Sequence, residues 1–147
     1  MDFSFTPEHE QIANSVSKIC DQFDDNYWLS HDQSGDFPHE FCSALAKDGW
    51  LGIAMPEAQG GSGLGITEAA LMMQTIAESG AAMSGCSAVH MNIFGPNVIV
   101  VFGNEEQKQR MLPPLINGET RACFGVTEPD AGLDTIHLKT KAIPKND

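Results

Sequence analysis

Apolar residues recur every three or four positions near the start of the chain, which is the pattern of a helix with one buried face. Over residues 7–27 they are Ile12, Val16, Ile19, Cys20, Phe23 and Tyr27. The preceding Thr6-Pro7-Glu8 offers a capping hydroxyl, a proline at the first helical position and an acid near the positive end of the helix dipole. We therefore predict one amphipathic helix over roughly residues 7–27.

In the middle of the chain, stretches rich in polar residues, glycine and proline alternate with apolar stretches. Polar residues 30–36 precede a short predicted helix that begins near Pro38 and buries Phe41 and Leu45. Residues 49–65 contain too many glycines and prolines for a helix and predict a long connecting loop. Thr67 is then the expected cap of a third helix that runs to about residue 79.

Two more helices are predicted before residue 118. Residues 85–102 carry few charges and suit a largely buried helix interrupted at Gly95-Pro96, although their β-branched residues leave a strand possible. Asn104 and Gln107 form a helix-capping pair, and Pro113-Pro114 is expected to end or kink the helix soon afterwards.

The last part of the chain has the pattern of strands. Residues 122–127 predict a buried strand, the turn residues 128–132 break it, and the alternation over 136–142 predicts a second, half-exposed strand. The predicted fold class is therefore mainly α, with a helical domain over residues 1–119 and the opening of a β-domain over 120–147. Two strands make no stable sheet alone, so we expect this second domain to be truncated.

Charge narrows the possible partners. The chain has 147 residues and a formal charge of −12, which opposes binding to nucleic acid or anionic lipid. Residues 1–100 hold only Lys18 and Lys47 against thirteen acids, so an anionic ligand is expected to bind late in the chain. The longest apolar stretch, residues 98–102, is too short to span a bilayer. Residues 1–5 resemble neither a secretion signal nor a transit peptide, so we expect a cytoplasmic protein.

No catalytic or metal-binding motif stands out. The five histidines form no H-E-x-x-H pattern, and the four cysteines form no C-x-x-C pair, so we assign no metal ligand and no catalytic residue. The histidines are expected at the surface. Cys123 lies on the predicted buried strand and is expected to be a core residue with an unreactive thiol.

One segment has the composition of a ligand site. Residues 124–134 combine an aromatic ring at a strand end, the Thr127 hydroxyl and a turn of small residues at Ala131-Gly132. Small residues allow backbone N–H groups to approach an anion or a flat ring. On composition alone, a tight turn after a strand is the better explanation of the segment.

The run Cys123-Phe124-Gly125-Val126-Thr127-Glu128-Pro129-Asp130-Ala131-Gly132-Leu133-Asp134 resembles the acyl-CoA dehydrogenase signature, in which a strand leads into T-E-P-x-A-G-S-D. Upstream stretches are similar to that family in order and spacing. They are Gly49-Trp50 through Gly60-Gly61, then Phe102 through Lys108, Leu112-Pro113 and Gly118-Glu119. The resemblance covers nearly the whole chain.

This resemblance implies a flavoenzyme of fatty acid metabolism with a helical domain, a middle β-domain and a C-terminal helical bundle, assembled as a homo-oligomer. Such enzymes oxidise an acyl-CoA thioester with FAD, and an electron-transfer flavoprotein reoxidises the flavin. The matched positions imply that Phe124, Val126 and Thr127 lie along the flavin ring. Gly132 is implied near the flavin pyrophosphate and the thioester.

Two positions depart from the family pattern. Leu133 stands where the family has a serine, which removes a hydroxyl from the implied substrate and cofactor contact, and Asp130 replaces a frequent glycine. The resemblance implies that the family's catalytic glutamate comes after residue 147. Glu128 is not assigned as the base, because in the family motif it belongs to the turn. We therefore expect the isolated chain to be inactive and to bind FAD weakly. The alternative is a non-catalytic helical module for interaction or oligomerisation, with residues 136–142 as an exposed strand edge.

Overall fold

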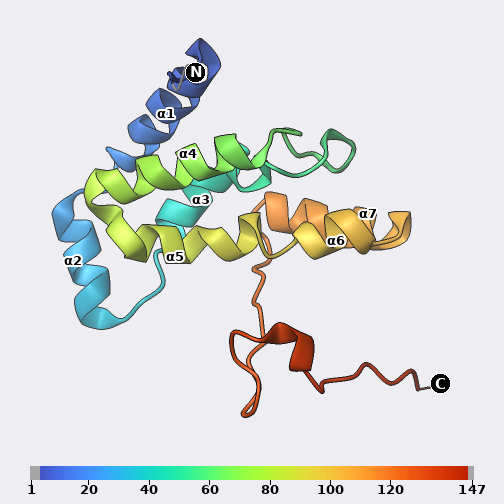
Figure 1. Cartoon of the computed structure of the whole chain (residues 1–147). Helices are drawn as coiled ribbons and strands as arrows, with labels where there is room; N and C mark the ends of the chain where they lie inside the picture. Colours follow the sequence, from blue (N-terminus) through green and yellow to red (C-terminus); the bar gives the residue numbers. More distant parts are fainter. Residues whose placement is uncertain (1–3, 146–147) are drawn as a thin grey trace.

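The computed structural model describes residues 4–145, and most of them form packed helices (Figure 1). The helices are α1 (Pro7–Cys20), α2 (Asp25–Ser34), α3 (His39–Lys47), α4 (Ile66–Ile76), α5 (Ala82–Ile93), α6 (Asn97–Phe102) and α7 (Glu105–Ile116). Shorter helical turns are η1 (Trp50–Gly52), η2 (Glu57–Gln59), η3 (Ala77–Ala81) and η4 (Thr135–His137). The prediction of a mainly helical chain is confirmed.

The single helix predicted over residues 7–27 is wrong, because the chain breaks between α1 and α2. The Asp24 carboxylate accepts a hydrogen bond from the Tyr27 N–H at 2.9 Å and caps a new helix there. Helix α2 then extends through residues 30–34, which we expected to be a turn, and ends at Gly35 with a φ of 75°. The aromatic rings of Phe23, Trp28 and Phe41 pack across the break, so apolar periodicity continues where the helix does not.

Helices α4 and α5 are joined by a corner. The backbone leaves helical geometry at Gly80, whose φ is 88°, and at Ala82, whose φ is 46°. The corner therefore ends the third helix near the predicted residue 79. Its expected cap is wrong: the helix begins at Ile66 after Gly65, and not after Thr67.

Residues 66–102 have the length and mean hydropathy, 1.3, of a possible membrane-crossing helix. The corner at Gly80 and the interruption after Ile93 divide this run into α4, α5 and α6. Helix α4 also packs along α1, and its Leu71, Met72 and Ile76 are buried. We interpret α4 and α5 of this run as core helices of a packed domain.

The first part of the glycine-rich loop over residues 49–65 belongs to the core, whereas most of residues 57–65 are exposed. Backbone hydrogen bonds fold it back on itself, including Ser62 N–H to Gly52 C=O at 3.0 Å and Gly63 N–H to Met55 C=O at 2.8 Å. Its Met55 is 1% exposed and joins a second hydrophobic cluster with Leu112, Leu115 and Ile116 of α7. The loop therefore supports α7.

Helices α6 and α7 follow the predicted boundaries but differ in burial. The interruption at Gly95-Pro96 and the Asn104–Gln107 capping pair are confirmed. Helix α6 is not buried as expected: Val98, Val101 and Phe102 are 56%, 57% and 82% exposed. Helix α7 continues through Pro113-Pro114 for two more residues and ends at Ile116.

The two predicted strands are absent from the described residues. Residues 122–127 form no ladder, and the pattern over 136–142 begins instead with the helical turn η4. A strand needs a neighbour to satisfy its backbone groups, and within residues 4–145 the only strand-type pairing is an isolated bridge between Glu128 and Ala131. After residue 121 the chain leaves the helices and extends away from them (Figure 1).

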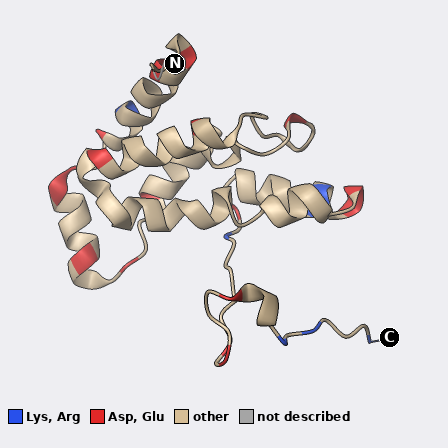
Figure 2. Ribbon diagram, viewed as in Figure 1, with Lys and Arg blue, Asp and Glu red and all other residues tan. Residues whose placement is uncertain are grey.

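Charge is distributed unevenly over this architecture (Figure 2). Acidic residues mark α2 and several helix ends, whereas basic residues gather on α7 and along the C-terminal segment. The segment that leaves the helices is thus the less acidic part of the protein, as the sequence predicts.

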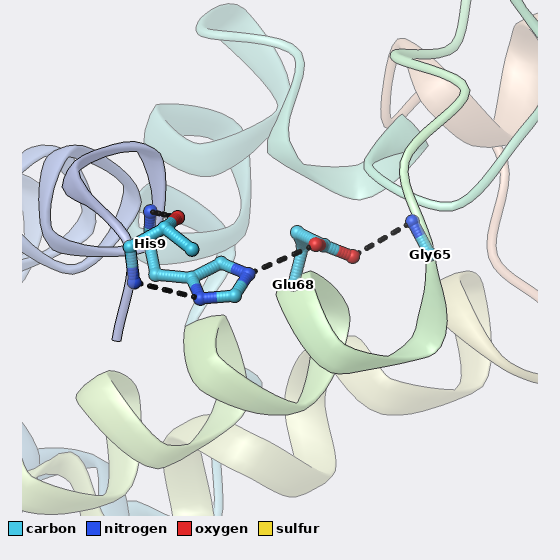
Figure 3. Close-up of polar contacts among 4 residues, drawn as sticks. His9, Gly65 and Glu68 are labelled. Carbon is cyan, nitrogen blue, oxygen red and sulfur yellow. Dashed lines mark hydrogen bonds and ion pairs between the residues drawn. The ribbon is translucent and has the colours of Figure 1, made fainter. Parts of the chain in front are cut away.

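A polar contact joins the starts of α1 and α4 (Figure 3). The Thr6 N–H donates to His9 Nδ1 at 3.4 Å, so a neutral His9 carries its proton on Nε2, which lies 3.1 Å from Glu68 Oε1. Glu68 Oε2 accepts from the Gly65 N–H at 2.9 Å. His9 is therefore half-buried and paired, contrary to our expectation of surface histidines.

Lowering the pH is expected to weaken this junction. Hydrogen bonds from the Glu68 backbone N–H, the His9 side chain and the Gly65 N–H hold the pKa of the Glu68 carboxyl below its ordinary value of 4.5. Its contribution to stability is present above that value and is lost as the pH falls through the lowered pKa. Urea unfolding between pH 7 and pH 3 should show a smaller loss of stability for Glu68→Gln than for the unmodified chain. Glu10→Gln, exposed on α1, is the control and should keep the original slope.

Candidate functional site

The five residues predicted to contact a ligand lie on one stretch of chain beyond the helices. Phe124 is 64% exposed, Val126 is half-buried and Thr127 is exposed. Gly132 and Leu133 follow in the next turn, and the Leu133 side chain is fully exposed. The structure thus places them in sequence along an open segment, with Leu133 farthest into solvent.

The segment is tied to the helices by Asn92, a side chain of α5 that is only 5% exposed. Asn92 Nδ2 donates to the carbonyls of Leu115 at 3.3 Å and Thr120 at 3.0 Å, and its Oδ1 accepts from the Ala122 N–H at 2.8 Å. One buried amide therefore fixes the backbone just before Phe124. The sequence marks Asn92 only as a polar residue in an apolar run.

The Arg121 side chain reinforces this attachment. Its guanidinium lies 4.2 Å from the centre of the Phe37 ring, a cation–π contact between the segment and the loop before α3. The sequence carries no signal for this contact, because Phe37 and Arg121 are far apart in the chain.

The backbone beyond the Asn92 contact is open. Within residues 4–145, the N–H groups of residues 123–127 make no hydrogen bond to another described group. A side chain added at Gly125 or Gly132 would meet no atom within 4 Å. The segment therefore presents free N–H groups, a phenyl ring and a hydroxyl to a ligand, without a side chain at the two glycines. This is a suitable surface for a flat, hydrogen-bonding ring with an anionic tail.

An apolar cavity of about 430 Å³ adjoins Phe124. It lies between α6, α7 and residues 120–124, and its apolar lining includes Val98, Ile99 and Met111. Met111 is 40% exposed. The exposed side of α6 and this cavity form a continuous apolar surface next to the segment.

The turn after Thr127 is organised by the Glu128 carboxylate. Oε2 accepts from the Lys139 N–H at 2.9 Å, while Oε1 accepts from the Thr140 N–H at 2.6 Å and from the Thr140 hydroxyl. These bonds, with the Thr140 hydroxyl contributing most, hold the pKa of Glu128 below its ordinary value of 4.5. A carboxylate engaged in this way is a weak proton acceptor, which agrees with assigning Glu128 to the turn.

The cysteines supply no evident nucleophile. Burial raises the pKa of the Cys42 thiol to about 11, so it is protonated at neutral pH. Cys123 is exposed rather than buried, and the strand on which we expect it, residues 122–127, does not form. Among residues 4–145, no three His, Cys, Asp or Glu side chains are grouped as metal ligands.

Comparison with known proteins identifies relatives of both the helices and the segment. The family model described as "Acyl-CoA dehydrogenase, N-terminal domain" matches residues 6–119. Bovine mitochondrial isovaleryl-CoA dehydrogenase (Bos taurus) is 37% identical over 142 residues, which cover 95% of this chain and 33% of that protein. The chain spans only 30% to 38% of the length of the leading curated relatives.

Solved structures agree with this comparison. An acyl-CoA dehydrogenase from Bacillus anthracis, complexed with FAD, superimposes with a TM-score of 0.79 at 30% identity, over 92% of this chain and 24% of that one. A chain from a study of the electron transferring flavoprotein of Acidaminococcus fermentans and flavin-based electron bifurcation gives a TM-score of 0.86 at 28% identity. That match covers all of this chain and 38% of the other.

Proposed function

Because this chain belongs to the acyl-CoA dehydrogenase family, we propose that it is the N-terminal part of an FAD-dependent enzyme that oxidises an acyl-CoA thioester to its α,β-unsaturated product. The observation that carries the proposal is the open segment 123–134, fixed directly behind the helices that match the family's N-terminal domain. The FAD named with the related Bacillus anthracis structure supports the choice of cofactor.

Four residues of the segment would hold the cofactor. The backbone N–H groups near Val126 are free to bond the polar edge of the flavin, and the Thr127 hydroxyl can do the same. The exposed Phe124 ring offers a face for the ring system, and Gly132 allows close approach of the pyrophosphate. When bound, FAD supplies the acceptor for the hydride that leaves the β-carbon of the thioester. Leu133 would add apolar contact near the substrate where related sequences have a hydroxyl.

The 147-residue chain alone is proposed to be inactive. Removal of the α-proton needs a base, and the carboxylate nearest to the segment in sequence, Glu128, is engaged by Lys139 and Thr140. The acyl-CoA substrate, an electron-transfer flavoprotein as acceptor, a homo-oligomeric state and a cytoplasmic location are parts of the same proposal for the whole enzyme.

An oligomerisation module without flavin is the second candidate function. The observation that favours it is the exposed apolar side of α6, where Phe102 is 82% exposed. The strand edge that we first expected for this role, residues 136–142, is absent. A chain that forms stable oligomers by light scattering, and loses them in Phe102→Asp without binding FAD, would favour this alternative.

Flavin retention and dye reduction test the main proposal. The 147-residue chain and the polypeptide encoded by the gene up to its stop codon are each mixed with FAD, desalted and examined by absorbance, with intact mass recorded. We expect a flavin band and acyl-CoA-dependent dye reduction from a longer gene product, and neither from the 147-residue chain. Dye reduction by the 147-residue chain would contradict its proposed inactivity. A longer product that retains no flavin would contradict the assigned function.

A further inference from the structure

The turn that carries Gly132 and Leu133 has little regular structure to hold it in place. Residues 128–134 contain no helix, and the Glu128–Ala131 bridge closes only the first residues. The chain then returns through η4 to Lys139 and Thr140. Inside this excursion, residues 128–140, the contacts are local, such as the pair of Asp134 Oδ2 and His137 Nδ1 at 2.6 Å, so its closure depends on contacts between its two ends.

The Glu128 side chain supplies most of those contacts. Its two carboxylate oxygens accept three hydrogen bonds from two consecutive residues, Lys139 and Thr140. Hydrogen bonds to a charged acceptor are stronger than those between neutral groups. The second link, from Lys139 Nζ to Asp130 Oδ2 at 3.4 Å, joins two side chains that are both more than three-quarters exposed, and such pairs contribute little.

We infer that Glu128 is a positioning residue for residues 123–134, the proposed cofactor segment. Its carboxylate joins the two ends of residues 128–140 and so holds the turn at Gly132 in the conformation that binds the ligand. This inference rests on the proposed function. Glu128 itself contacts neither the substrate nor the reacting atoms; it acts through the backbone of Lys139 and Thr140. A loop that is already ordered before the ligand binds loses less conformational entropy on binding, so the protein binds the ligand more tightly.

Two substitutions that each remove one negative charge separate this positioning role from a general effect of charge on binding. Glu128→Gln keeps the shape of the side chain but places an NH₂ group against N–H and O–H donors, so at least one oxygen loses its bonds. Asp130→Asn removes one negative charge from the same turn and breaks only the exposed contact with Lys139. Any general effect of charge on the anionic FAD is common to both variants.

Nuclear magnetic resonance of the 147-residue chain measures two things separately: the contact of Glu128 with Lys139 and Thr140, and the binding of FAD. In the unmodified chain, the amide protons of Lys139 and Thr140 should shift as Glu128 is protonated below pH 4.5. The other charged groups in or facing the excursion are Asp130, Asp134, His137 and Lys139. These groups are unchanged in the Glu128→Gln variant. That variant should nevertheless lose the pH-dependent shift of the Lys139 and Thr140 amide protons. Unchanged signals from α1 to α7 show that the helices remain folded.

Titration with millimolar FAD then tests positioning. We expect FAD to shift the signals of residues 123–134, and Glu128→Gln to weaken this response about tenfold through loss of the ordered turn, whereas Asp130→Asn responds like the unmodified chain. Equal FAD responses in the two variants would overturn the inference and leave the proposed function standing. No FAD response in the unmodified chain would overturn the proposed flavin contact, and the inference with it.

Discussion

Replacement of Asn92 by leucine is expected to lower the free energy of unfolding by about 3 kcal/mol. Leucine fills a similar volume, so the loss comes from hydrogen bonds rather than from a cavity. Without the amide, the Ala122 N–H and the Thr120 carbonyl lose their partners beside a side chain that is 5% exposed. An unsatisfied group costs roughly 1–3 kcal/mol where it is buried. The bond to the Leu115 carbonyl is buried, those to Thr120 and Ala122 are partly buried, and the apolar gain from leucine offsets part of the loss. Urea unfolding measures the total.

Asn92→Leu should also loosen the attachment of segment 123–134 to the helices. Hydrogen exchange at the Ala122 amide is expected to become faster, because its acceptor is gone. Asn97→Leu is the matched control: Asn97 is exposed at the start of α6, and its replacement should change stability by less than about 0.5 kcal/mol. An Asn92→Leu protein as stable as the Asn97→Leu protein would show that the buried amide is not a stabilising anchor.

Features that depend on neighbouring residues could be predicted from the sequence. The starts of α1 and α7 follow from Thr6 and Asn104, because a cap bonds to N–H groups three residues away. The break before α2 has the same kind of signal in Asp24. It was missed because Phe23 and Tyr27 keep the apolar spacing across the break.

Features that depend on distant residues could not be predicted in this way. Residues 122–127 have the composition of a strand, but a strand exists only where another pairs with it, and pairing is not a property of the segment. The roles of Asn92 and Glu128 are set by partners 23–30 and 11–12 positions away, respectively. The resemblance of residues 123–134 to the family signature therefore predicts a candidate segment, whereas its two attachments require the structure.

The glycine-rich loop shows the same limit and leads to the second large effect. Its sequence predicts a connection, yet Gly61 lies directly against the buried residue Met55. A Cβ at Gly61 would lie 2.2 Å from the Met55 carbonyl oxygen and 2.7 Å from Met55 Cβ, which no real contact allows. Gly61→Ala must therefore displace backbone, and Met55 packs on Leu112 and Ile116 of α7. Overpacking of this kind costs about 3 kcal/mol.

A displaced Met55 should move the end of α7, at Leu115 and Ile116, on which it packs. Asn92 bonds both Leu115 and Thr120, so the displacement should also reach segment 123–134. We therefore expect Gly61→Ala to lower the urea midpoint and also to speed exchange at the Ala122 amide. Ser62→Ala is the matched control, since its N–H bond to Gly52 is a backbone bond that alanine retains. If both variants unfold at the original urea concentration, the loop yields without cost and does not support α7. If Gly61→Ala is less stable but the Ala122 amide is unchanged, the loop stabilises the helices without positioning the segment that the flavin would contact.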